Sequence, residues 1–431
     1  MVKKFGDDVM EENRLMDYLG EGVTQFHVTD MCEKTLLEKG FHNLAYGKAF
    51  GRLTPGRYFT VPFNSMLIAW TVGEKIENLR IGAAHTDFPM LKLKSNPDMV
   101  KAGYTTLNVE PYGGLIKETW FDRPLGIAGK VVVEGDDCFK PRSLLYDSKR
   151  PVAVIPNLAP HLKRGDKEGS IDVAKEMVPV TGVAGEEMGE AAILNMIADE
   201  MDIAVDSVLD YDLYLYNTDD AEMVGVSGSM ISSPRIDNVS SVAALIDTMV
   251  AVDAKNSSNI NVIALFDNEE IGSRSKQGAD SVLFRECIDR IIEAAGVGSN
   301  KAALTQSAFM VSLDVAHGTH PNYSDKSDPT NKVVLGAGPV LKSSASQRYV
   351  SDSEASAVIT AISRKYGIKL QKTVNKSGMP GGQTLGPIMS SYIPVRAVDM
   401  GIPVLAMHSA RELADERDYK ELVELLGHIF L

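Results

Sequence analysis

The stretch VIALFDNEEIGSRS, residues 262–275, places two adjacent glutamates, Glu269 and Glu270, just after a run of apolar residues. The run at 262–266 is continuous rather than alternating, which is typical of a strand in a parallel sheet that is covered on both faces. Adjacent side chains point in different directions, and ligands of open α/β sheets gather at the carboxyl ends of strands. The pattern predicts a buried strand whose two acids take different roles in one cleft. A solvated turn with two surface acids is the alternative.

Further strand candidates alternate with amphipathic helices in the first hundred residues and again after about residue 235. This alternation predicts the α/β class, with a mixed or parallel sheet flanked by helices. NLRIGAAHTD (78–87) is expected to run as a strand up to His85. SDSEASAVITAISRKYG (351–367) is expected to form a helix that is opened by a capping box of Ser351 and Glu354.

The middle of the chain has a different pattern. AGKVVVEG (128–135) and YDLYLYNT (211–218) are short, rich in aromatic and β-branched residues, and typical of strands. We therefore predict a β-rich domain at 93–230 that is inserted into an α/β domain formed by 1–92 and 231–431.

Composition excludes several classes of protein. The net charge is −14, and no run of Lys and Arg is long enough to follow a phosphate backbone, so nucleic acid is not an expected partner. No segment supplies the roughly 18 consecutive apolar residues of a membrane helix, and the start of the chain lacks a signal-peptide apolar core. Three scattered cysteines indicate a reducing cytoplasm and argue against a cysteine metal site.

Histidines and acids recur where apolar strands end or helices begin. Imidazole nitrogen and carboxylate oxygen are the ligands that zinc prefers beside cysteine. His85 is followed two residues later by Asp87, a carboxylate that can orient a ligating imidazole. A core histidine is the alternative for His408, and a plain helix N-cap is the alternative for Asp237. The stretches are GAAHTDFP (82–89), SPRIDNVS (233–240), FDNEEIGS (266–273), VSLDVAHGTHPNY (311–323) and VLAMHSARE (404–412).

From about residue 20 onward the chain contains, in order, HTDFP, TWFDRPLGIAGKV, IPNLAPHL, SPRIDN, FDNEEIGS, SLDVAHGTHPNYSDK, GPVLKSSASQRYVSD, GGQTLGPI and VLAMHSARE. This ordered set resembles the aspartyl aminopeptidase family, which includes vacuolar aminopeptidase I. The resemblance implies a dinuclear zinc exopeptidase, cytosolic or vacuolar, with an α/β catalytic domain, an inserted dimerisation domain and assembly into a tetrahedral dodecamer. Cobalt or manganese could replace zinc.

The same resemblance implies roles for individual residues. Glu269 would be the general base, and Asp87 would support His85. Two metals would each have two ligands of their own and share one bridging carboxylate. The implied set is His85 and Asp314 on one metal, Glu270 and His408 on the other, and Asp237 between them.

Four further positions match residues near the substrate. His161 corresponds to a histidine that reaches the neighbouring subunit's site, and one of His317 and His320 would stabilise the tetrahedral intermediate. Lys342 matches a lysine that meets an acidic N-terminal side chain, whereas a surface lysine is the alternative. Phe88 and a slightly longer loop at 376–387 depart from the family pattern.

We therefore expect a zinc aminopeptidase that acts on peptides and prefers acidic N-terminal residues. A related enzyme with another substrate is the first alternative: a neutral or glutamyl aminopeptidase, a deacylase, or a carboxypeptidase. A catalytically idle oligomeric shell protein is the second, and the presence of Glu269 and of all five implied ligands disfavours it.

Overall fold

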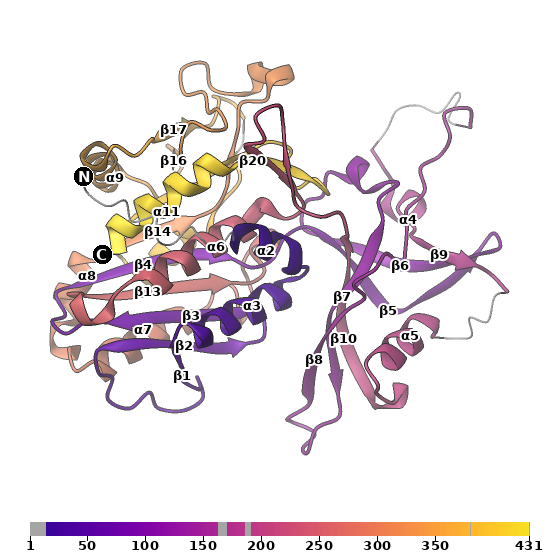
Figure 1. Cartoon of the computed structure of the whole chain (residues 1–431), viewed down its shortest axis with the longest axis horizontal. Helices are drawn as coiled ribbons and strands as arrows, with labels where there is room; N and C mark the ends of the chain where they lie inside the picture. The colour runs from indigo at the N-terminus through magenta and orange to yellow at the C-terminus, as the bar shows by residue number, and fades with distance from the viewer. Residues whose placement is uncertain (1–13, 163–169, 186–190, 380, 431) are drawn as a thin grey trace. The chain divides into compact units, whose positions relative to one another are not determined.

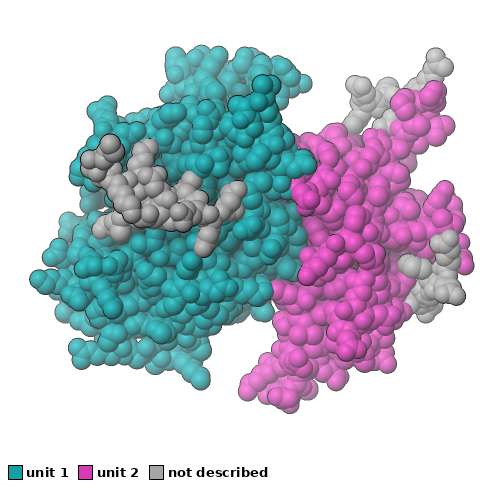
Figure 2. All heavy atoms as spheres, viewed as in Figure 1, with its two compact units in different colours: residues 1–87, 221–407, 412–431 teal, residues 88–220, 408–411 magenta. Residues whose placement is uncertain are grey.

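A computed structural model describes residues 14–162, 170–185, 191–379 and 381–430, so the first residues of the predicted catalytic domain and Pro380 of the 376–387 loop fall outside it. The described residues form two compact units (Figure 2). The first comprises Met1–Asp87, Ala221–Met407 and Glu412–Leu431. The second comprises Phe88–Asp220 and His408–Arg411.

The first unit is built on a mixed sheet (Figure 1). The predicted buried strand is confirmed: β13 is buried at every position, and it pairs parallel with β4 and antiparallel with β3. β14 and β18 continue the parallel part beyond β4. The strands, in spatial order, are β1 (His42–Asn43), β2 (Gly56–Phe63), β3 (Met66–Val72), β13 (Asn259–Phe266), β4 (Asn78–His85), β14 (Phe309–Leu313), β18 (Arg396–Gly401), β16 (Val340–Ser343) and β17 (Gln371–Val374).

Helices cover both faces of this sheet. α6, α2, α3 and α11 pack together on one face, where a Cβ added to Gly82 of β4 would meet Leu245 of α6 and Phe430 of α11. Residues of α7, α8 and α10 share an apolar core with the strands on the other face. The α/β class with a mixed sheet flanked by helices is confirmed. The helices are α2 (Arg14–Glu21), α3 (Gln25–Glu38), α6 (Ile236–Ala251), α7 (Leu283–Ala294), α8 (Lys301–Ser307), α9 (Ser353–Tyr366), α10 (Leu385–Tyr392) and α11 (Glu416–Phe430).

Two small sheets complete the first unit. One pairs β11 (Glu222–Val224), β12 (Met230–Ser233) and β20 (Glu412–Asp415), and the other pairs β15 (Ala316–His317) with β19 (Pro403–Val404). The first sheet brings together the segments that precede α6 and α11, because β12 leads into α6 and β20 leads into α11.

The second unit is an antiparallel sheet with its own apolar core. The two strands predicted in the middle of the chain form β7 and β10, which pair with each other. Both are interior strands, and the edges are β8 and β9. The elements are β8 (Arg142–Asp147), β7 (Leu125–Val133), β10 (Val208–Asn217), β5 (Met90–Lys101), β6 (Tyr104–Tyr112) and β9 (Val180–Val183) in spatial order, with α4 (Val173–Glu176) and α5 (Ala192–Glu200).

One predicted helix start is wrong. α9 is capped by Asp352, whose side chain accepts a hydrogen bond from the Ala355 amide, and not by Ser351. The Ser351 hydroxyl instead accepts a hydrogen bond from the Asp399 amide of β18. Within the described part of the chain, every helix is too short or too polar to cross a bilayer.

Candidate metal centre

The carboxyl ends of three parallel strands and the start of α6 carry four of the five predicted ligands. β13, β4 and β14 are neighbours, and their carboxyl ends meet at one edge of the sheet. His85 is the last residue of β4, and Asp314 directly follows β14. The two glutamates lie in a 3₁₀ turn, Glu269–Ile271, shortly after β13. Asp237 stands in the first turn of α6.

His85 is buried and turns one ring nitrogen toward a group of carboxylates. Its Nε2 lies 3.6 Å from Asp237 Oδ1, 3.8 Å from Asp314 Oδ1 and 4.0 Å from Glu269 Oε2. The other nitrogen, Nδ1, is 3.0 Å from the Asp87 carbonyl oxygen and 3.4 Å from Asp87 Oδ1. A hydrogen bond from Nδ1–H to that carbonyl leaves the Nε2 lone pair directed at the carboxylates.

Asp87 also fixes the turn that carries the two glutamates. Its Oδ1 accepts a hydrogen bond from the Glu269 amide and its Oδ2 accepts one from the Glu270 amide, both at 3.1 Å. The turn begins at Asn268, whose φ of 64° lies in the left-handed region that asparagine tolerates well. Asp87 therefore positions the imidazole of His85, mainly through its carbonyl oxygen, and fixes the backbone of Glu269 and Glu270 through its carboxylate.

The geometry and chemistry of these donors fit a metal ion. Three ligand atoms, one each from His85, Asp237 and Asp314, lie within 4.8 Å of one another. A carboxylate oxygen of Glu270 also lies within 4.8 Å of one of Asp237. Imidazole nitrogen with carboxylate oxygens is an ordinary zinc donor set. Several carboxylates concentrated in a buried site repel one another unless a cation compensates their charge.

Asp237 is held in place by neighbours that the sequence did not reveal as part of the site. Its amide donates to Glu412 Oε2 at 2.9 Å, and the next side chain, Asn238, donates to the Leu313 carbonyl at 2.9 Å. These bonds connect the start of α6 to β20 and to the end of β14. Glu412 ends the stretch VLAMHSARE, so its position at the end of a motif was the available signal.

Ionisation in the site follows from burial and charge. Burial raises the pKa of Glu269 to about 8, and the neighbouring carboxylates of Asp314, Asp87 and Asp237 add to the shift while His85 opposes it. Burial alone would raise the pKa of Asp314, but the Lys342 ammonium and His85 outweigh it and hold that pKa well below its usual range.

Asp267 is a second buried acid that the sequence did not single out, although it directly precedes the glutamate turn. Burial and then repulsion by Asp87 raise the pKa of the Asp267 carboxyl to about 7. Its Oδ2 accepts a hydrogen bond from the Ser65 hydroxyl at 2.5 Å.

Lys342 is inside the first unit rather than on its surface. Its side chain is 3% exposed, and its Nζ lies 3.2 Å from Asp314 Oδ2 and 3.0 Å from the Val315 carbonyl oxygen. The surface-lysine alternative is therefore excluded, and the ammonium is already bonded to a candidate metal ligand.

The other predicted site residues lie in or beside the short strand β15 or in the second unit. His317 is exposed in β15, and His320 precedes the 3₁₀ segment Pro321–Lys326, where its Nδ1 accepts from the Asn322 amide at 3.2 Å. His161 is an exposed turn residue of the second unit. His408, also of the second unit, has its Nδ1 2.9 Å from the Gly114 carbonyl oxygen.

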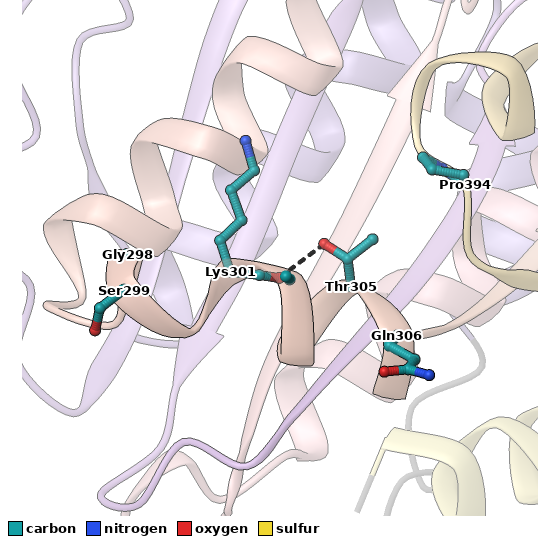
Figure 3. Close-up of a pocket in the computed structure, with 7 residues that line it drawn as sticks. Gly298, Ser299, Lys301, Thr305, Gln306 and Pro394 are labelled. Carbon is teal, nitrogen blue, oxygen red and sulfur yellow. Dashed lines mark hydrogen bonds between the residues drawn. The ribbon is translucent and has the colours of Figure 1, made fainter.

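A pocket elsewhere in the first unit is separate from this centre. Figure 3 shows it beside Lys301 and Thr305 of α8, with Pro394 across from them. α8 ends two residues before β14 begins, and Pro394 lies two residues before β18, so this pocket lies by the amino ends of strands whose carboxyl ends face the centre. No ligand of the centre lines it.

Comparison with known proteins identifies the family. The model of the aminopeptidase I zinc metalloprotease (M18) family matches residues 18–430. The probable M18 family aminopeptidase 2 of Clostridium acetobutylicum is 39% identical over 413 residues, which cover 94% of this chain and 95% of that protein.

Solved structures agree with this result. A structure of the complex of Ape4 and Nbr1 matches with a TM-score of 0.92 at 30% identity, over 97% of this chain and 85% of the matched chain. Chaetomium thermophilum mApe1 matches with a TM-score of 0.88 at 29% identity, over 99% and 98%. The resemblance seen in the sequence is confirmed, and the chain belongs to the aminopeptidase I zinc metalloprotease (M18) family.

Proposed function

We propose that this aminopeptidase uses two bound divalent metal ions, preferably zinc, to release N-terminal residues from peptides. His85 and Asp314 would hold one ion, Glu270 and His408 the other, and Asp237 would bridge both. The His408 assignment rests on the family resemblance. When bound, the ions lower the pKa of a water molecule and polarise the scissile carbonyl.

Glu269 is proposed as the general base. It would take a proton from the attacking water and return it to the amine that leaves. Its carboxylate stands 4.0 Å from His85 Nε2, whereas Glu270 has a carboxylate oxygen within 4.8 Å of a ligand atom of Asp237. The single observation that carries this split is that Asp87 holds both amides of the turn while the Glu269 carboxylate lies beside His85 and the Glu270 carboxylate beside Asp237.

Amide substitutions of the two glutamates test this proposal. Glu269→Gln should retain both metals and lose turnover by about 10²–10⁴-fold, the usual contribution of a general base. Glu270→Gln should lose one metal more readily than wild type. Both are measured by metal analysis after dialysis against a weak chelator, together with kcat on one peptide substrate. Equal metal loss in the two variants would contradict separate roles.

We also propose a preference for acidic N-terminal residues, which the family resemblance supports. A net charge of −14 disfavours acidic peptides at long range, so the preference needs a local cation at the substrate side chain. A panel of Asp, Glu, Ala and Leu aminoacyl substrates, each with a free and an acetylated amine, tests it. We expect the highest kcat/KM for free Asp or Glu. Turnover of acetylated substrates would favour a deacylase or carboxypeptidase, and a higher value for Leu would favour a neutral aminopeptidase.

The second unit and the cysteines support proposals about assembly and cellular location. We propose that the second unit mediates dimerisation and that dimers build a tetrahedral dodecamer, as the resemblance implies. We place the protein in the cytoplasm because Cys32, Cys138 and Cys287 are free thiols, two of them buried, a pattern expected in a reducing compartment.

A further inference from the structure

Residues 317–320 carry two histidines, and the backbone between them is supported by a neighbouring loop. The Thr319 amide donates to the Val333 carbonyl oxygen at 2.8 Å, and the Val333 amide donates to the Thr319 hydroxyl at 3.0 Å. A Cβ added to Gly318 would lie 2.9 Å from Leu335 Cδ1. The Leu335 side chain therefore packs directly against the backbone that separates the two histidines.

The 333–339 loop, which makes these contacts, is anchored on α11 by a buried carboxylate. Asp418 lies in the first turn of α11. Its Oδ2 accepts a hydrogen bond from the Gly336 amide and its Oδ1 accepts one from the Gly338 amide, both at 2.6 Å. A carboxylate binds amide donors more strongly than a neutral acceptor does. Because Gly336 directly follows Leu335, the anchor is one residue away from the side chain that packs on the histidine segment.

A second side chain holds the same loop from β17. The Gln371 Oε1 accepts from the Val334 amide at 2.9 Å, and its Nε2 donates to the carbonyl oxygens of Val334 and Gly338 at 2.9 Å and 2.8 Å. The Gln371 amide also donates to the Pro339 carbonyl oxygen at 2.8 Å. Contiguous hydrogen bonds and packed side chains of this kind can couple one element to another. The loop is thus fixed by α11 and β17 on one side and contacts the histidine segment on the other.

We propose that Asp418 is a positioning residue that holds the 333–339 loop against the backbone between His317 and His320. It thereby sets the position of the histidine that stabilises the tetrahedral intermediate, a role that the family resemblance implies for one of the two. Asp418 acts through the loop and not on the reacting atoms. This proposal rests on the proposed function, because it requires a hydrolytic intermediate for the histidine to stabilise.

Asp418→Asn provides the first part of the test. Asparagine keeps the side-chain volume but offers one acceptor and one donor group in place of two acceptors, so one loop amide loses its partner. We expect kcat on an aminoacyl substrate to fall by about 10–100-fold, the range reached when a group is misplaced by about 1 Å. KM and bound metal should stay at the wild-type values, because stabilisation of the intermediate acts only in the transition state.

A double-mutant cycle distinguishes positioning from a general loss of stability. One of His317→Ala and His320→Ala is expected to lose turnover. Adding Asp418→Asn to that variant should lower kcat by less than about twofold more, because the loop then has no working histidine to position. The matched control is Asp247→Asn. Asp247 of α6 is also buried and also contacts α11, where it accepts from the Tyr419 hydroxyl at 2.7 Å, and its kcat should equal that of wild type.

Each other outcome overturns the positioning role. Losses that multiply in the double variant, an unchanged kcat in Asp418→Asn, an equal fall in Asp247→Asn, or full turnover in both histidine variants would do so and leave the proposed function intact. Full turnover in Glu269→Gln would overturn the proposed function itself. If Asp418→Asn does not fold, Gln371→Leu replaces it in the same cycle, because it removes the other side-chain anchor of the loop at a partly exposed position.

Discussion

At the scale of single residues, the carboxylate of Asp87 explains why two adjacent glutamates can serve one centre. It accepts both glutamate amides and lies beside Nδ1 of His85. Second-sphere groups of this kind orient ligands, and their loss costs about 10–100-fold in metal affinity or activity. The H-x-D spacing predicted that Asp87 supports His85. The bonds to Glu269 and Glu270 depend on how β4 and β13 pair, which local sequence does not encode.

The raised pKa of Glu269 predicts proton release when metal binds. With a pKa of about 8, the Glu269 carboxyl of the metal-free protein is mostly protonated at pH 7, and nearby cations favour its ionised form. We expect wild type to release more protons than Glu269→Gln on binding zinc at pH 7. The difference should vanish above about pH 9, where the carboxyl is already ionised.

Calorimetric titration in buffers of different ionisation enthalpy measures this release. Wild type should release more protons because the pKa of Glu269 is raised, and an acid with a raised pKa keeps its proton at neutral pH until a cation binds nearby. His85, whose pKa is also raised because its carboxylate partners outweigh burial, contributes protons in both proteins. Equal release from wild type and Glu269→Gln at pH 7 would argue that Glu269 is ionised before metal binds.

At the scale of elements, the sequence was informative wherever one segment decides its own structure. The apolar run at 262–266 became part of the buried strand β13, and NLRIGAAHTD became β4 with His85 at its end. Features that depend on neighbours were not predictable. The segments 128–135 and 211–218 were predicted as strands, but their own sequences do not show that β7 and β10 are interior strands, which follows from the pairing of β8 with β7 and of β5 with β10. The burial of Lys342 likewise follows from tertiary packing.

The contact between β18 and the segment after β14 gives an element-scale prediction. A Cβ at Gly401 would lie 2.1 Å from the Asp314 carbonyl oxygen and 2.7 Å from its carbonyl carbon. Gly401→Ala must therefore displace the Asp314 backbone, and we expect unfolding to become easier by about 1–3 kcal/mol, the usual cost of overpacking. Denaturant unfolding of the metal-free protein measures the loss.

Gly20→Ala provides the control for this change, because a Cβ at Gly20 would meet nothing within 4 Å. This residue lies in α2, and we expect its replacement to leave the stability unchanged or to increase it by up to about 1 kcal/mol. If Gly401→Ala instead binds metal more weakly but unfolds as easily as wild type, the substitution disturbs the position of Asp314 without the predicted loss of stability.

At the scale of the whole molecule, the second unit has a surface suited to a partner. Tyr104 of β6 and Val183 of β9 are paired and about half exposed, and Val100 of β5 is 71% exposed. These strands lie at the β9 edge of the sheet. Edge strands with exposed apolar side chains are usually covered, which supports the proposed dimerisation role.

The last prediction is that active sites are shared between subunits. His161 lies in the second unit and Glu269 in the first, and we propose that His161 serves the centre of a neighbouring subunit. His161→Ala and Glu269→Gln should then each be nearly inactive alone and regain activity when co-expressed. Random pairing makes about half of the dimers mixed, each with one complete centre of two, so recovery should approach about a quarter of wild type. Differently tagged subunits allow mixed oligomers to be isolated, and an inactive mixed oligomer would place His161 in its own subunit's centre or outside catalysis.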